Sequence, residues 1–264
     1  PFACTQDFLY YFIPNFDIGE SLHDRARHLM VAGVTPYTAI DYPGQFSAVV
    51  FVQGCPWKCV YCHNPHMQPR RFDERFLHGD WDEVVGLLKR RQGLLDAVVF
   101  SGGEPTIDPA LPDAIEEVKA MGFLVGLHTS GCYPEHLKAV VQKLDWVGID
   151  IKAPLSDGAL YQKIVGREKG DHAAAVSQCL DLLIEEKVPF ECRTTAHPAY
   201  LSDESLITLA RELKARGVSH FALQVYRCPK ELELPFENVG YEYPNKDVLA
   251  TLEELFENFE LRRG

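Results

Sequence analysis

Short apolar runs alternate with amphipathic stretches along most of the chain. Each run is rich in β-branched and aromatic residues, which is typical of a strand buried on both faces of a sheet. The six runs are Phe46–Gln53, Ala97–Phe100, Phe123–Leu127, Trp146–Ile151, Pro189–Thr194 and Phe221–Tyr226.

The stretches between these runs carry apolar residues at helical spacing. Ser202 is a candidate N-cap, and Gly122 and Gly217 stand where helices are expected to end. Strands that alternate with helices predict an α/β fold with a parallel sheet, and six repeats suit a barrel or a partial (β/α)6 barrel. The predicted helices are Trp81–Arg91, Pro112–Met121, Glu135–Leu144, Asp171–Glu186, Ser202–Arg216 and Lys246–Leu261.

The first residues differ from the rest. Residues 1–32 have weak periodicity, so they are predicted to be an N-terminal extension that is not native or is poorly ordered, with Met30 as a candidate native start. Residues 33–264 are predicted to form one domain.

Composition narrows the class of protein. The chain has 264 residues, 46% of them hydrophobic, so a large core is expected. Its formal net charge of −12 argues against a general nucleic-acid binder. It contains no apolar run long enough to span a membrane and no secretory signal, which predicts a cytoplasmic protein.

Polar or glycine-rich segments follow four of the predicted strands. They are a cysteine loop after the first strand, Gly102-Gly103-Glu104-Pro105 after the second, His128-Thr129-Ser130-Gly131 after the third and Asp150-Ile151-Lys152 after the fourth. In parallel α/β folds, ligands bind at the carboxyl ends of the strands. The four segments are therefore expected to face one cavity.

The cysteine loop contains Cys55, Cys59 and Cys62 in a C-x3-C-x2-C spacing. Three thiols leave one unpaired in any disulfide scheme. A structural zinc ion is usually bound by four ligands, so a zinc site would need His63 or His66 in addition to the three thiols. An ordinary four-thiolate iron–sulfur site lacks its fourth cysteine here. A [4Fe–4S] cluster held by three thiolates leaves one iron open to a ligand. The remaining cysteines are interpreted as small buried side chains, namely Cys4, Cys132, Cys179, Cys192 and Cys228.

At these residues the sequence resembles the radical S-adenosylmethionine (SAM) superfamily, which shares this cysteine spacing with an aromatic residue, here Tyr61, before the last cysteine. Gly102-Gly103-Glu104 resembles the G-G-E motif of that family. The resemblance implies a partial TIM-like barrel of the radical SAM type, with a [4Fe–4S] cluster and SAM as cofactors. It implies that the open iron chelates SAM, and that reductive cleavage of SAM yields a 5′-deoxyadenosyl radical.

The resemblance also implies roles for residues at the other strand ends. Tyr61 is expected near the adenine, and Gly102, Gly103 and Glu104 near the methionine amino group of SAM. Ser130 is expected near the SAM carboxylate, and Arg193 near its ribose or carboxylate. Asp150 and Lys152 match a D-x-K pattern of glycyl-radical-enzyme activating enzymes.

The finer resemblance is to those activating enzymes. Residues 40–44 (I-D-Y-P-G), 51–56 (F-V-Q-G-C-P) and 62–65 (C-H-N-P) resemble their pattern. Residues 35–44 and 127–131 look most like the activating proteins of anaerobic ribonucleoside-triphosphate reductase. The implied partners are that glycyl radical enzyme and a reduced flavodoxin- or ferredoxin-type electron donor.

Two alternatives stay open at this point. One is a radical SAM enzyme acting on a small molecule, similar to 7-carboxy-7-deazaguanine synthase, and the other is a non-catalytic metal or electron-transfer module. His128 stands where the formate-lyase type has an aspartate that helps bind a monovalent cation, so a cation near His128 and Asp150 is an open question.

Overall fold

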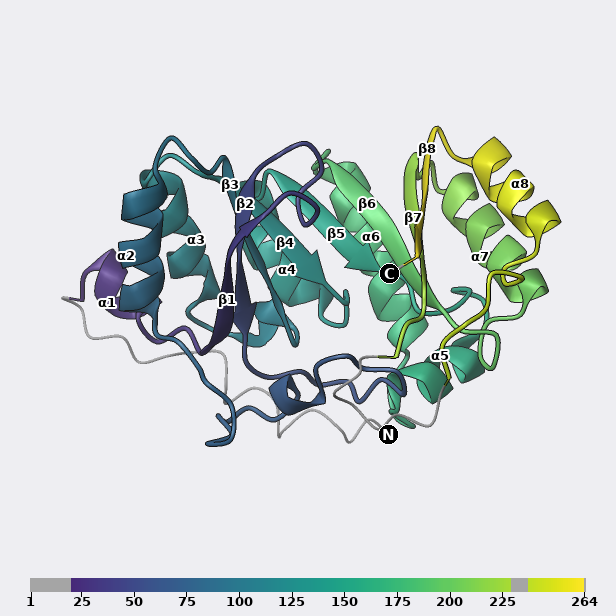
Figure 1. The fold of residues 1–264 in the computed structure, drawn as a ribbon, viewed down its shortest axis with the longest axis horizontal. Helices are drawn as coiled ribbons and strands as arrows, with labels where there is room; N and C mark the ends of the chain where they lie inside the picture. The colour runs from purple at the N-terminus through teal and green to yellow at the C-terminus, as the bar shows by residue number, and fades with distance from the viewer. Residues whose placement is uncertain (1–19, 229–236, 264) are drawn as a thin grey trace, which may run out of the picture.

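The structure is a computed structural model that describes residues 20–228 and 237–263. Its centre is a curved eight-stranded sheet in the order β1 to β8 (Figure 1). β1 pairs with β2 in antiparallel fashion, and every later neighbour is parallel. The strands are β1 Val31–Thr38, β2 Ser47–Val52, β3 Ala97–Gly102, β4 Leu124–Thr129, β5 Trp146–Asp150, β6 Phe190–Ala196, β7 His220–Val225 and β8 Asn258–Arg263.

The helices cover one face of this sheet (Figure 1). Several begin at side-chain caps: Asp80 accepts from Glu83 N, and Asn245 accepts from Val248 N. The α-helices are α1 Leu22–Ala26, α2 Trp81–Arg91, α3 Leu111–Ala120, α4 Pro134–Val140, α5 Gly158–Val165, α6 His172–Glu185, α7 Asp203–Ala215 and α8 Lys246–Leu255. Short 3-10 turns are η2 Pro65–Met67, η3 Pro105–Ile107 and η4 Val141–Lys143.

The main hydrophobic core lies between the sheet and these helices, and a second, smaller cluster of buried hydrophobic residues is separate from it. Val50, Phe100 and Leu127 belong to the main core and are fully buried. The smaller cluster includes Tyr42 and Trp146, whose ring centroids are 5.2 Å apart. Tyr42 comes from the loop between β1 and β2, so this loop packs against residues of the sheet itself.

The six predicted strands correspond to β2–β7, and the α/β partial barrel is confirmed. Several expectations were incomplete or wrong. The sequence analysis missed α1, β1 and α5 (Gly158–Val165), and β1 adds an antiparallel edge to the otherwise parallel sheet. The predicted helix Lys246–Leu261 ends at Leu255, and the chain then forms β8, because residues 258–263 pair in parallel with β7.

Part of the predicted N-terminal extension packs on the domain. Ser21 forms a capping box with Asp24 at the start of α1. Ala26 is fully buried, and Arg25 forms an ion pair with Asp113 of α3 at 2.9 Å. Residues 20–32 thus belong to the packed unit, while residues 1–19 lie outside the described part of the chain.

Candidate functional site

The three cysteines lie on one loop directly after β2, and this loop (residues 54–71) is called the cluster loop below. Cys55, Cys59 and Cys62 are free thiols with partly exposed side chains. The loop closes on itself, because Cys55 N donates to Gln68 O at 2.8 Å. The Gln53 amide lies 2.8–3.1 Å from the carbonyl oxygens of residues 66, 69 and 71. A glutamine at the end of β2 therefore fixes the returning arm of the loop.

The other arm of the cluster loop lies on the C-terminal end of α5. Lys58 N donates to Val165 O at 2.9 Å, and Val60 N donates to Ile164 O at 3.0 Å. These carbonyls have no partner within their own helix, so the loop satisfies them. Asp157, which caps α5, and Gly166, which ends it, were the signals in the sequence for this helix.

Gly102 and Gly103 pack tightly against β2 and the cluster loop. A Cβ at Gly102 would lie 2.5 Å from Val52 N, and one at Gly103 would lie 2.2 Å from Gly54 O. Glu104 N also donates to Gly54 O at 2.8 Å. Both glycines were expected near the methionine amino group of SAM; in this structure the backbone that approaches them so closely is the chain's own.

Glu104 is fully buried at the centre of a hydrogen-bond network. Its Oε1 accepts from Thr106 N and Oγ1 and from Thr129 Oγ1, at 2.6–3.1 Å. Its Oε2 accepts from Ser130 N at 2.7 Å and from Ser130 Oγ at 2.5 Å. Glu104 and Ser130 are thus brought together as predicted, but as partners of each other. Thr106 and Thr129 were not singled out in the sequence.

Asp150, Lys152 and Arg193 form a second group, at the end of β5 and at the neighbouring position of β6. Lys152 Nζ lies 2.9 Å from Asp150 Oδ2, and Arg193 Nε lies 3.3 Å from Asp150 Oδ1 without hydrogen-bond geometry. Burial raises the pKa of Asp150, but the charges of Lys152 and Arg193 outweigh burial, and the net pKa is lowered. Burial lowers the pKa of Lys152, but the charge and hydrogen bond of Asp150 together with Tyr61 and Cys59 outweigh burial, so the net pKa is raised and the ammonium stays charged.

Tyr61 connects this second group to the cluster loop. Its side chain is buried, and the Lys152 ammonium lies 6.0 Å from its ring centroid, within cation–π range. Burial raises the pKa of the Tyr61 hydroxyl, which has no hydrogen-bond partner among the described residues. Its ring also packs edge-on against Tyr200. Predicted residues from the loop and from β5 and β6 therefore converge.

The donor set of the cluster loop fits an iron–sulfur cluster. Burial raises the pKa of Cys55, and it raises the pKa of Cys59 to about 11, although Lys152 opposes that shift. Thiolate ligands must lose these protons when a metal binds. Within residues 20–228 and 237–263, no three His, Cys, Asp or Glu side chains converge tightly enough for a single metal ion. A cubane cluster distributes its thiolates over separate irons, so it does not require that convergence.

The two histidines considered for a zinc site are engaged in ring contacts. His63 packs against Tyr226 with centroids 5.5 Å apart, and His66 stacks on Phe76 at 4.3 Å. Neither contact brings the ring into a set of converging metal ligands in the described part of the chain. The geometry therefore favours the three thiols as the ligand set.

His128 is half-buried between strand ends and the β1–β2 loop. Its Nε2 lies 2.8 Å from Asp41 O, a carbonyl that only accepts, so Nε2 carries the proton. Nδ1 lies 3.3 Å from Ser101 Oγ and accepts from it. Burial, together with the charge of Arg193, lowers the pKa of His128 to about 3. The imidazole is therefore neutral near pH 7, with protein groups at both nitrogens.

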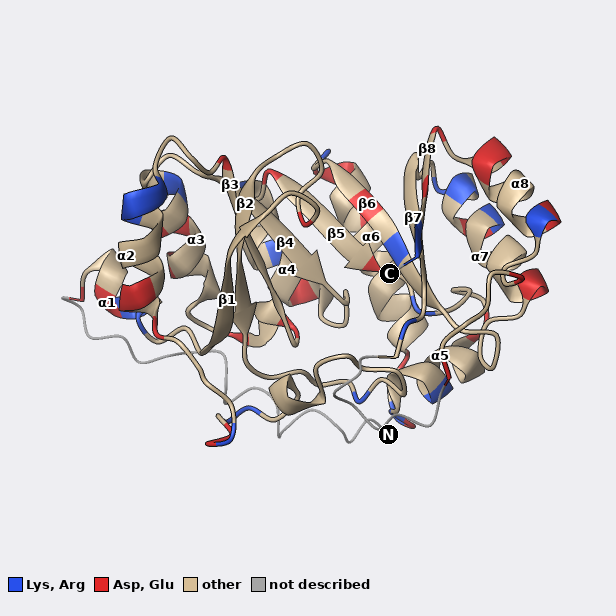
Figure 2. Ribbon diagram, viewed as in Figure 1, with Lys and Arg blue, Asp and Glu red and all other residues tan. Residues whose placement is uncertain are grey.

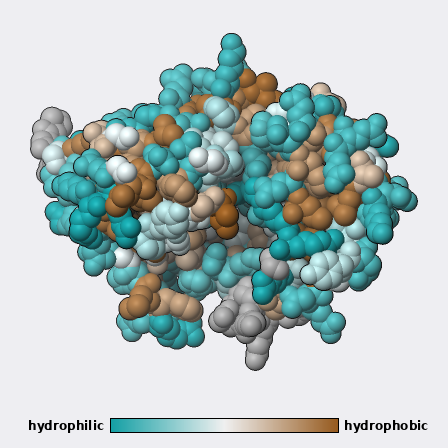
Figure 3. Space-filling view, turned by 45° about the horizontal axis from the view of Figure 1, so that its top comes forward, coloured by the Kyte–Doolittle hydropathy of each residue, from teal (hydrophilic) through white to brown (hydrophobic). Residues whose placement is uncertain are grey.

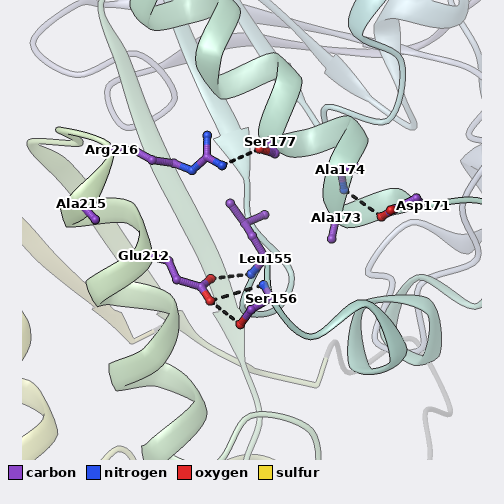
Figure 4. Close-up of a pocket in the computed structure, with 9 residues that line it drawn as sticks. All are labelled: Leu155, Ser156, Asp171, Ala173, Ala174, Ser177, Glu212, Ala215 and Arg216. Atoms are coloured by element: carbon purple, nitrogen blue, oxygen red, sulfur yellow. Dashed lines mark hydrogen bonds between the residues drawn. The ribbon is translucent and has the colours of Figure 1, made fainter.

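A cavity of about 530 Å³ lies away from these residues, among α6, α7 and the segment after β5 (Figure 4). Glu212 accepts hydrogen bonds there from Leu155 N and from the Ser156 hydroxyl, and Arg216 pairs with Ser177. These side chains tie neighbouring elements together. The cavity contains no cysteine and none of the predicted site residues.

Exposed lysines lie on and near the cluster loop although the chain is acidic overall, and Glu168 lies beside them. Lys58, Lys163 and Lys169 are exposed on the loop, on α5 and just after it, and blue segments lie at and beside α5 in Figure 2.

The face of the molecule drawn in Figure 3 carries separate hydrophobic patches among hydrophilic side chains. None of the described helices combines the length and apolar character needed to cross a membrane.

Comparison with known proteins agrees with this site. The sequence profile of the Radical SAM superfamily matches residues 49–213, more than half of the chain. A Methanocaldococcus jannaschii protein named "Putative glycyl-radical enzyme activating enzyme MJ1227" is 30% identical over 254 residues, covering 86% of this chain and 98% of that protein. Pyruvate formate-lyase-activating enzyme from Streptococcus mutans is 27% identical over 247 residues, covering 86% of this chain and 90% of that enzyme.

Solved structures share the fold. Streptococcus suis SuiB bound to S-adenosylmethionine aligns with a TM-score of 0.61 and 14% identity, covering 80% of this chain and 48% of SuiB. This chain therefore spans about half the length of SuiB. A radical SAM methyltransferase from Sphaerobacter thermophilus aligns with a TM-score of 0.60 and 20% identity, covering 84% of this chain and 67% of that one. The chain belongs to the radical SAM superfamily, as an enzyme of the glycyl-radical-enzyme activating type that uses a [4Fe–4S] cluster and S-adenosylmethionine.

Proposed function

We propose that this enzyme activates an anaerobic ribonucleoside-triphosphate reductase by abstracting a hydrogen atom from a backbone glycine of that partner. Support comes from the three free thiols of the cluster loop, which lie beside buried polar strand ends in a chain similar to activating enzymes over most of its length. The choice of reductase rests on the resemblance at residues 35–44 and 127–131. When bound, the reduced cluster and SAM supply a 5′-deoxyadenosyl radical.

The chain's own residues hold and orient these groups. Cys55, Cys59 and Cys62 would hold the [4Fe–4S] cluster through their thiolates. Lys152 and Arg193 provide cations for the SAM carboxylate or ribose, with Asp150 holding them in place before SAM binds. Tyr61 would pack near the adenine of SAM. Glu104 acts through Ser130 and Thr129, whose hydroxyls it fixes, and so sets the shape of the edge that SAM meets.

The electron donor is proposed to be an acidic protein of the reduced flavodoxin or ferredoxin type. The exposed Lys58, Lys163 and Lys169 lie on the cluster loop, on α5 and just after α5, and opposite charges steer such encounters. Electron-transfer complexes of this kind are weak and salt-dependent.

Two linked assays test the proposal. After anaerobic reconstitution with iron and sulfide, dithionite and SAM should yield 5′-deoxyadenosine, and Cys59→Ala should lose both cluster and product. Adding the reductase subunit should then produce a glycyl-radical signal in electron paramagnetic resonance. Deoxyadenosine without any glycyl radical would contradict the partner, whereas the absence of deoxyadenosine would contradict the enzyme itself.

A second candidate has one supporting observation. A 7-carboxy-7-deazaguanine synthase from Methanopyrus kandleri is 30% identical over 130 residues, covering 43% of this chain and 52% of that enzyme. Formation of a deazaguanine product without a protein partner would favour this second function. The activating enzymes match about twice as much of the chain, so they are preferred.

A further inference from the structure

The C-terminal turn of α5 makes an unusually close backbone contact with the cluster loop. Gly166 follows the last residue of α5 and adopts the left-handed conformation, with φ +63°. A Cβ at this position would lie 2.3 Å from Lys58 O and 3.3 Å from Lys58 Cβ. The Lys58 carbonyl belongs to backbone between two cysteines, so it cannot move away without moving the loop.

The same turn makes directed bonds with the loop on both sides of that contact. Lys58 N and Val60 N donate to the last carbonyls of α5, and Arg167 Nε donates to Pro56 O. These bonds reach residues immediately next to Cys55 and Cys59. The end of one helix therefore determines the path of the loop between its first two thiols.

Helix α5 also contacts the strand end that carries Lys152. Lys152 N donates to the Tyr161 hydroxyl at 3.1 Å, and the Tyr161 ring packs edge-on against Trp57 of the cluster loop, with centroids 6.1 Å apart. Tyr161 is fully buried. One short helix thus touches both the loop that carries the thiols and the end of β5.

We propose that the turn Ile164–Arg167 is the template that holds the cluster loop in its ligand-binding shape, with Gly166 as the positioning residue. The proposal rests on the three-thiol ligand assignment made above but not on the identity of the partner enzyme. A side chain at Gly166 displaces the Lys58 peptide and spreads Cys55 and Cys59. In this role the α5 turn orients the thiol ligands by fixing the backbone of the loop that carries them.

The test compares Gly166→Ala with Gly217→Ala. Gly217 follows α7 and also has a positive φ (+82°), but a Cβ at this position would meet nothing within 4 Å. Its substitution therefore carries the backbone strain without the collision. The assays are iron and sulfide content after anaerobic reconstitution, and the rate of iron release to a chelator. Gly166→Ala is expected to release iron about tenfold faster than Gly217→Ala, a typical effect for groups that orient metal ligands.

Circular dichroism and thermal unfolding of the cluster-free proteins establish whether each variant is folded. If Gly166→Ala does not fold, Arg167→Met replaces it, because that change removes the N–H donor to Pro56 O and leaves the backbone intact; faster iron release from it supports the proposal. A folded Gly166→Ala protein, or Arg167→Met in its place, that retains iron as well as Gly217→Ala overturns it. Retention of the cluster by Cys59→Ala would instead overturn the ligand assignment.

Discussion

The carboxylates of Glu104 and Asp150 lie at nearby strand ends but are bound by different kinds of partner. Glu104 is fully buried and accepts five hydrogen bonds, all from uncharged donors. Asp150 has a side chain that is 31% exposed and lies between the cations of Lys152 and Arg193. Glu104 is bound by neutral N–H and O–H dipoles, and Asp150 is bound by two charged side chains that are themselves largely buried.

The difference separates a structural role from a ligand-facing one. The donors to Glu104 come from the segments after β3 and β4, so removing its charge disturbs two strand ends together. The partners of Asp150 are cations, which can also pair with an anion placed beside them. We therefore expect Glu104 to govern stability and Asp150 to govern how the two cations are presented to SAM.

The largest effect is expected from Glu104→Gln. The new amide N–H group faces donors that have no other acceptor, so the variant should lose about 3 kcal/mol of unfolding free energy. Urea denaturation of the cluster-free protein measures this loss. The control is Glu135→Gln, a glutamate at the start of α4, which should change little. A loss below about 1 kcal/mol would contradict the structural role of Glu104.

A smaller loss is expected from Asp150→Asn. It leaves two cations without their counter-charge, but partial exposure lets water screen them, so the loss should be about 2 kcal/mol rather than the larger value for a fully buried pair. The folded-state pKa of Asp150 is lowered, so its contribution is present above the unfolded pKa of about 4 and is lost as pH falls below it. A difference from wild type that stays constant as pH falls below about 4 would contradict this.

His128 lies close to the charges of Arg193 and Asp150, and its substitution gives a pH-dependent test of this region. Its pKa is lowered from 6.5 to about 3 in the folded protein, so its contribution is complete above pH 6.5 and is lost as pH falls toward 3. Between pH 7.5 and 5.5, wild type should lose about 1.4 kcal/mol more stability than His128→Gln. The other histidines are common to both proteins and cancel. Parallel pH profiles would show that the imidazole is not buried in neutral form.

The smallest effect is expected from removing one neutral donor to Glu104. Thr106→Val deletes the hydroxyl that lies 2.6 Å from Oε1 and keeps the shape of the side chain. Because Thr106 N and Thr129 Oγ1 still donate to this oxygen, the loss should be about 1 kcal/mol. A loss as large as that of Glu104→Gln would mean that the network fails as a unit when any member is removed.

Much of the fold could be predicted because its strands are buried on both faces. The run Phe46–Gln53 is apolar throughout most of its length, and the observed β2 lies within it. The end of the chain could not be predicted in the same way. Residues 258–263 mix apolar and charged side chains, and they form β8 because β7 offers an edge to pair with. Pairing of that kind depends on tertiary structure rather than local pattern.

The candidate site shows the same limit. The cysteine spacing and the placement of Glu104, Ser130 and Asp150 after strands were sufficient to predict that these residues lie at one edge of the sheet. Which of them touch could not be predicted, because Ser130 meets Glu104 across 26 residues of sequence. The close approach of Gly166 to Lys58 is likewise visible only in three dimensions.

The transfer of a hydrogen atom from the partner's glycine is the claim that can be tested most directly. Anaerobic reductase subunit labelled with deuterium at its glycines would be mixed with the reconstituted enzyme, dithionite and SAM. Mass spectrometry of the 5′-deoxyadenosine should show one added deuterium, in step with the growth of the glycyl-radical signal. Unlabelled 5′-deoxyadenosine accompanied by no glycyl radical would contradict the proposed reaction.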